Sequence, residues 1–133
     1  MQKISLAFIA SSLFACNCFA AAPRFPAHAQ ISVLAMPDGK SISEPSKIAE
    51  LLAVLGESKS GWGYTWHTYP VPQAKIYFRS QSGQAICRLD IGTDWVGSDC
   101  GVELKSNWPP YTKVTSEQAR FFKAFVAGTW EVK

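Results

Sequence analysis

Two segments of the chain place hydrophobic residues at helical spacing. The first follows the i, i+3, i+4, i+7 pattern of a helix with one buried face. Its apolar stripe consists of Ile48, Leu51, Leu52 and Leu55. Ser43 precedes it as an N-cap, Pro45 stands in the first turn, where a proline loses no hydrogen bond, and Gly56 follows the last apolar position. The pattern predicts a surface helix that begins near Ser43 and ends at Gly56.

The second helical segment begins with a capping box. Thr115 and Gln118 have the spacing at which each side chain bonds the other residue's backbone N–H. The apolar stripe that follows consists of Phe121, Phe122, Phe125 and Val126. Gly128 is a typical helix stop, so we expect this helix to end at Ala127.

Between and around these helices, apolar and polar residues alternate as in half-buried strands. The segments with this pattern or with many strand-forming residues are 30–35, 75–79, 84–91 and 95–104. Short runs rich in glycine, serine and aspartate separate the last three and predict hairpin turns. The loop 107–111 contains two prolines, and the alternation of Trp130 and Val132 with polar residues indicates a final edge strand.

This order of elements predicts the fold class. Consecutive hairpins form an antiparallel sheet, and helices with one apolar stripe must cover a face of it. We therefore expect an α+β two-layer domain over residues 30–133, with about four to five strands and both helices on one face. Residues 21–29 precede this domain. We expect them to form an extended arm, because Pro23 and Pro26 disfavour a helix.

Residues 1–20 have the parts of a signal peptide. Lys3 gives a positive start, an apolar stretch follows from Ile4 to Phe14, and small residues occupy 20–22. The apolar stretch is about half the roughly 20 residues needed to span a bilayer. We expect cleavage after Ala20 or Ala22, no transmembrane segment, and an exported product that is periplasmic or secreted.

Lipid attachment is the alternative to simple cleavage. Residues 13–16 resemble the sequence cut before a cysteine that receives a lipid, and Cys16 would then carry the anchor. That cut would leave Cys18 as an odd thiol beside Cys87 and Cys100, whereas cleavage after Ala20 removes both early cysteines. The cysteine count therefore favours simple cleavage.

The charge pattern does not indicate a polyanionic partner. Cleavage after Ala20 removes Lys3 alone among the charged residues, so the net charge falls from +3 to +2. The remaining basic residues form no block. We therefore expect no nucleic-acid partner.

The predicted hairpin pairs the last two cysteines. A tight turn at Thr93 and Asp94 sets Ile91 opposite Val96, and the same register sets Cys87 opposite Cys100. Cysteines that face each other across neighbouring strands are within bridging distance, and a loop of about 14 residues closed by a disulfide gains roughly 3 kcal/mol. Two free buried thiols are the alternative.

An aromatic loop is the candidate binding segment. Trp62, Tyr64 and Trp66 lie at period two, which on an extended chain turns their rings to one side. If these rings are exposed, they form a platform that can bind a protein of the cell envelope or extracellular space, or a glycan. Alternatively they cap the sheet as core. Asp94 and Trp95, at the predicted hairpin tip, extend the candidate surface.

No motif indicates a metal or a cofactor. His67 lacks nearby partners of the kind that bind zinc, and Asp90, Asp94 and Asp99 do not have the spacing of a calcium loop. We therefore expect a small, disulfide-containing binding module of the inhibitor or immunity type, with His67 among its binding residues. The alternative is a small exported hydrolase that uses His67 with a nearby carboxylate.

Overall fold

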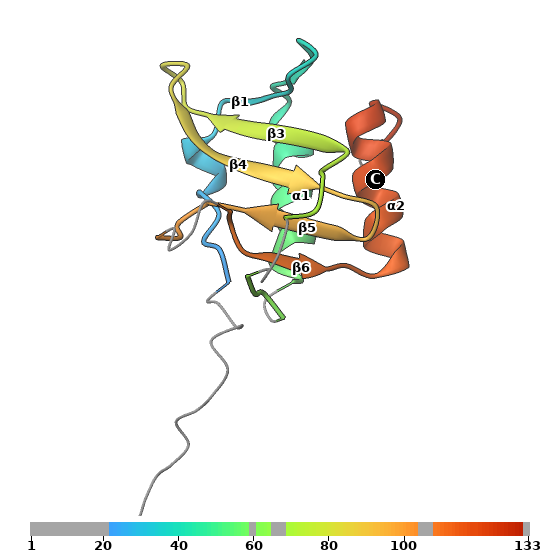
Figure 1. Ribbon diagram of the computed structural model, residues 1–133. Helices are drawn as coiled ribbons and strands as arrows, with labels where there is room; N and C mark the ends of the chain where they lie inside the picture. Colours follow the sequence, from blue (N-terminus) through green and yellow to red (C-terminus); the bar gives the residue numbers. More distant parts are fainter. Residues whose placement is uncertain (1–21, 59–60, 65–68, 104–107, 132–133) are drawn as a thin grey trace, which may run out of the picture.

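The computed structural model describes residues 22–58, 61–64, 69–103 and 108–131 (Figure 1). The expected signal peptide and Cys16 lie outside the described residues, as do Trp66 and His67. Within these ranges the chain forms six strands and two α-helices, besides one short 3₁₀ helix.

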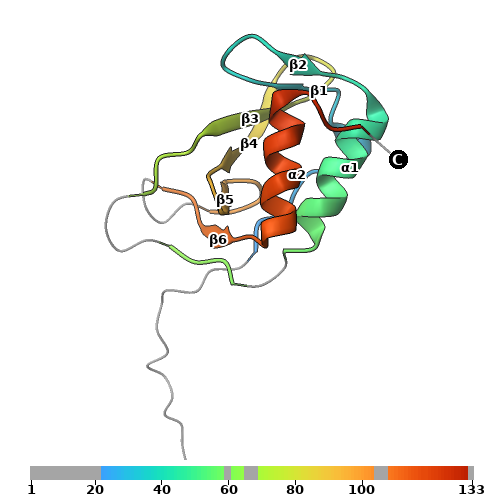
Figure 2. The same ribbon diagram turned by 90° about the vertical axis from the view of Figure 1, so that its right-hand side faces the viewer.

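Six antiparallel strands form one sheet in the order β2-β1-β3-β4-β5-β6. The strands are β1 (Val33–Ala35), β2 (Ser41–Ile42), β3 (Ala74–Arg79), β4 (Ala85–Ile91), β5 (Trp95–Ser98) and β6 (Tyr111–Lys113). Both helices, α1 (Pro45–Gly56) and α2 (Ser116–Ala127), lie on the same face of this sheet (Figure 2). The predicted α+β two-layer fold is confirmed, with six strands in place of four to five.

The additional strands are short, and they stand at the two edges. β2 has two residues and follows the turn at 36–40. β6 has three residues and begins at Tyr111, the last residue of the predicted loop. Its outer side pairs with Gly63 through two backbone hydrogen bonds, of 2.9 and 3.0 Å. In the tail, residues 129–131 form no strand, so the expected edge strand is wrong at Trp130, while its other apolar position, Val132, lies outside the described residues.

The first helix is confirmed, with its start one residue later than predicted. Glu44 rather than Ser43 is the N-cap, and Pro45 is the first helical residue, where its missing N–H costs nothing. Ile48, Leu51 and Leu55 are buried in the core. The fourth member of the predicted stripe, Leu52, is only partly buried.

The second helix follows its prediction closely. The Thr115 side chain accepts a hydrogen bond from the backbone N–H of Gln118, and the Gln118 side chain accepts one from the N–H of Thr115, which completes the capping box. Phe121, Phe122 and Phe125 are buried. Gly128 ends the helix with φ 79°, a left-handed conformation that favours glycine.

The hairpin of β4 and β5 has the predicted register. Ile91 pairs with Val96, and Cys87 forms a disulfide with Cys100 across a Cα–Cα distance of 5.1 Å. The predicted bridge is therefore present, and neither of these two cysteines is a free thiol.

The arm before the sheet is packed against the domain. It is extended up to Ala27 and then forms a short 3₁₀ helix, His28–Gln30, so the first strand begins at Val33 rather than at residue 30. The N–H of Arg24 donates a 2.8 Å hydrogen bond to the carbonyl of Cys100. Gly101 adopts φ 64°, and a Cβ there would lie 2.7 Å from the Cβ of Arg24, so this close approach requires glycine.

Candidate functional site

The face of the sheet opposite the helices is the candidate site, and we call it the outer face. Alternate residues of each strand point to opposite faces. Leu34, Ile76, Phe78, Leu89 and Val96 belong to the core on the helix side, so their strand neighbours point outward. The outer face comprises Val33, Ala35, Lys75, Tyr77, Arg79, Arg88, Asp90, Trp95, Gly97, Tyr111 and Lys113. Figure 1 looks onto this face, with α1 behind the sheet.

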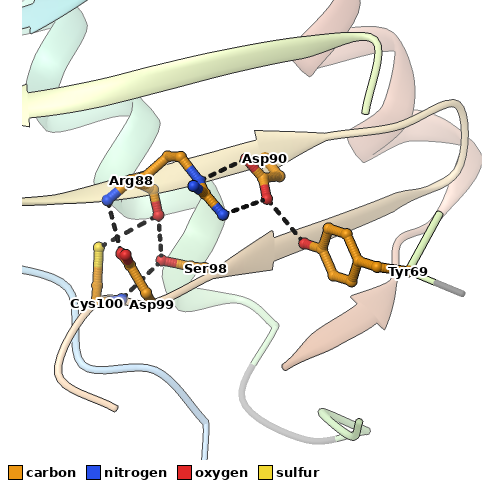
Figure 3. Close-up of polar contacts among 6 residues, drawn as sticks. All are labelled: Tyr69, Arg88, Asp90, Ser98, Asp99 and Cys100. Carbon is orange, nitrogen blue, oxygen red and sulfur yellow. Dashed lines mark hydrogen bonds and ion pairs between the residues drawn. The ribbon is translucent and has the colours of Figure 1, made fainter. Parts of the chain in front are cut away.

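A buried carboxylate lies at the centre of the outer face. Asp90 is 1% exposed. The Nε atom of Arg88, two residues earlier on β4, lies 2.9 Å from Asp90 Oδ1 and pairs with it by charge rather than by an aligned hydrogen bond. Arg88 Nη2 donates a 3.2 Å hydrogen bond to Asp90 Oδ2 (Figure 3). A buried charge is tolerated only when it is paired, and the guanidinium supplies this pairing.

A tyrosine from the preceding loop completes the network. The hydroxyl of Tyr69 donates a 2.9 Å hydrogen bond to Asp90 Oδ2, as Figure 3 shows. Gly97 provides the space for this ring on β5, since a Cβ there would lie 2.1 Å from the Tyr69 hydroxyl oxygen. Glycine weakens a strand interior, and here its position is explained by the close approach of the phenol.

Three aromatic rings pack around Tyr69 and form a four-ring cluster with it. Its ring stacks on Trp108 with a centroid distance of 5.2 Å and an angle of 4°. Trp95 and Tyr111 contact it edge to face at 5.4 and 6.2 Å. Trp95 is buried, whereas Trp108 is 46% exposed. The cluster therefore exposes one large indole, that of Trp108, to solvent. The ring beneath it, Tyr69, is held by packing and by its hydrogen bond to Asp90.

A second set of polar contacts joins β4 to the segment that follows β5. The backbone N–H of Arg88 donates a 2.8 Å hydrogen bond to Asp99 Oδ1. The buried Ser98 hydroxyl donates to the carbonyl of Arg88 at 2.8 Å and accepts from the N–H of Cys100 at 3.1 Å. These bonds hold the backbone of Arg88 in place next to the disulfide. They therefore also position its side chain, whose guanidinium contacts Asp90.

Burial, together with the negative charge of Asp90, raises the pKa of Tyr69 well above its ordinary range. In the unfolded chain a tyrosine loses its proton near pH 10, whereas folded Tyr69 keeps it. Unfolding therefore releases a proton above that pH, and stability that is fully present below about pH 10 is lost as the pH rises further.

We predict that Tyr69→Phe reduces this alkaline loss of stability. Urea denaturation between about pH 9 and 11 gives the free energies of unfolding of wild type and variant. The difference between them should shrink as the pH rises through the range in which a free tyrosine titrates. A difference that stays constant over this range would show that the Tyr69 proton is not linked to folding.

The structure corrects one expectation for the aromatic loop. Trp62 is 1% exposed and its Nε1 donates a 2.7 Å hydrogen bond to the carbonyl of Ser58, so the expected exposure of its ring is wrong. Tyr64 is half-buried, and Trp66 and His67 lie outside the described residues. At the hairpin tip Asp94 is exposed, while Trp95 lies in the aromatic cluster of the outer face.

Several residues of the outer face were missed from the sequence. Tyr69, Arg88 and Trp108 had no place in the predicted surface. Two signals were available: opposite charges two residues apart on the polar side of a strand, at Arg88 and Asp90, and a glycine inside a strand at Gly97. Neither signal identifies Tyr69 as the residue that fills the space.

The described residues offer no convergent metal site, and the hydrolase alternative concerns His67, which lies outside them. The one group of three ligand-type side chains there is Cys87, Asp99 and Cys100, and both sulfurs are used in the disulfide. Asp90 and Asp99 accept bonds from Arg88, and Asp94 is exposed at the hairpin turn.

Within the described residues no helix has the length and apolar character needed to cross a membrane. By its fold and site the protein is a two-layer α+β domain with an aromatic and basic outer face. Comparisons of the chain with protein-family models, with curated proteins and with solved structures give no match.

Proposed function

We propose that this protein is an exported binding module of the inhibitor or immunity type, and that its outer face binds a protein of the cell envelope or extracellular space. The observation that carries the proposal is Trp108, a half-exposed indole stacked flat on the anchored ring of Tyr69. Tryptophan and tyrosine on a rigid base are typical centres of protein interfaces, because little side-chain entropy is lost when they are buried.

The charge of the outer face indicates the chemistry of the partner. It carries four cations, at Lys75, Arg79, Arg88 and Lys113. The guanidinium of Arg88 is already paired with Asp90, and Asp99 accepts a backbone N–H, so Lys75, Arg79 and Lys113 leave this side with an excess of positive charge. A surface with this balance complements an acidic partner and accelerates its association. It also favours a protein over a neutral glycan, which would gain little from the cations.

Export is supported by the signal-like N-terminus and by the disulfide. The apolar stretch after Lys3 has the length of a signal peptide rather than of a membrane span. Disulfides such as Cys87–Cys100 persist in oxidising compartments. An inhibitor or immunity protein needs a rigid contact surface, and the packed rings of the outer face supply one.

We predict that Trp108→Ala weakens partner binding by about 2 kcal/mol or more, roughly 30-fold, because it removes the exposed anchor of the interface. The mature protein is used to capture its partner from envelope and secreted proteins of the source cell. The dissociation constant is then measured with the purified partner, for wild type and variant, alongside thermal melts.

Ile86→Ala is the matched control. Ile86 is 42% exposed, close to the value for Trp108, but it lies at the β3–β4 end of the sheet. It should bind as wild type does. The proposal fails if folded Trp108→Ala keeps its affinity, if Ile86→Ala loses as much, or if the specific ligand is a glycan.

A further inference from the structure

A groove on the helix side of the domain is distinct from the outer face. One wall is α2, and the other consists of the start of β3, the β4–β5 turn and the β1–β2 turn. The groove has a volume of about 560 Å³, within the range of small-molecule sites. A second hollow of about 270 Å³ shares Asp38, Gln73, Ala74 and Val126 with it and extends it past Met36 and Pro72.

The lining combines an aliphatic floor with cations at the rim. Ala74, Ile91, Phe122 and Val126 contribute apolar surface to the floor. Arg120 and Lys123 stand on the side of α2 that lines the groove, one turn apart. Both are exposed, and neither forms an ion pair with another described residue within 4 Å.

The remaining charges leave the rim positive. The groove contains one carboxylate, Asp38, which lies 3.7 Å from the ammonium group of Lys40. Lys75, which the outer face shares, also lines the extension. An anion placed between Arg120 and Lys123 would therefore meet two cations, and it would displace no ion-pair partner that belongs to the described part of the chain.

We propose that this groove binds a small organic anion with an aliphatic body, of the chemical class of a medium-chain carboxylate. The carboxylate would lie between Arg120 and Lys123, and the chain would follow Ala74 and Val126 toward Met36. Charge-assisted hydrogen bonds fix the headgroup, and each buried methylene adds affinity. The two hollows share four lining residues and so continue one another, which suits a chain better than a compact ring.

Calorimetric titration of the disulfide-bonded mature protein with decanoate tests the proposal. Two probes separate its parts: decyltrimethylammonium keeps the chain but reverses the charge, and acetate keeps the headgroup without the chain. Decanoate should bind, and both other probes should bind at least about tenfold more weakly.

Lys123→Gln should weaken decanoate binding about tenfold. Lys113→Gln, which removes the same charge from the outer face, is the matched control and should leave it unchanged. Equal affinity of Lys123→Gln and wild type, equal binding of decyltrimethylammonium, or no decanoate binding at millimolar concentration would each overturn the proposal. None of these results depends on Trp108. The experiments therefore test the groove proposal and the outer-face proposal independently.

Discussion

Replacement of Phe122 by alanine is expected to lower the free energy of unfolding by about 3–5 kcal/mol, the range for removing a buried phenylalanine. The Phe122 ring is among the largest fully buried side chains and packs edge to face on Phe121 at 5.3 Å. It joins α2 to the core, and a cavity there cannot close without moving the helix. Urea denaturation monitored by circular dichroism measures the loss.

Its neighbour Lys123 supplies the control. Lys123 is exposed one residue along the same helix, so Lys123→Ala should change stability by less than about 0.5 kcal/mol. Leu52→Ala should lie between the two, because Leu52 is only partly buried. A loss below about 1 kcal/mol for Phe122→Ala would contradict the packing of α2 on the sheet.

The second large effect is expected for Asp90→Ala. Removal of this carboxylate leaves the guanidinium of Arg88 and the hydroxyl of Tyr69 without their shared acceptor. Breaking a buried ion pair costs about 3–5 kcal/mol, and we expect the low end because the Arg88 side chain is 28% exposed and regains some water. Chemical denaturation at neutral pH gives the value.

A double variant tests whether the network acts as a unit. Arg88→Met combined with Asp90→Leu removes both charges and fills part of the space. It should be less destabilised than Asp90→Ala alone, because no unpaired charge remains. The single variants Arg88→Met and Asp90→Leu complete the comparison. If their losses of stability add up to the loss of the double variant, Arg88 and Asp90 contribute independently.

The elements with strong local signals were predictable from the sequence. The capping box at Thr115 and the stop at Gly128 predicted the two ends of α2. Each of these caps joins residues that are at most four positions apart in the sequence, so a local pattern reveals it. The period-two pattern of β4, together with one tight turn, fixed the register that brings Cys87 to Cys100.

The parts that depend on distant contacts were not predictable in this way. β2 and β6 are too short to show a period, and only pairing with a neighbour makes them strands. Trp62 lies among glycines and so suggested an exposed loop, but its ring is buried in the core. The Tyr69–Asp90 contact spans 21 residues, and no local pattern encodes it.

The two short edge strands bear on how the protein behaves at high concentration. A long, unpaired strand edge is a template on which another chain can add, which is a common route to aggregation. Here one edge offers only Ser41 and Ile42, and the other, three residues long, is already paired at Tyr111 with Gly63. Growth of the sheet from chain to chain is therefore disfavoured at both ends, and the protein can keep a broad, aromatic outer face without polymerising through its edges.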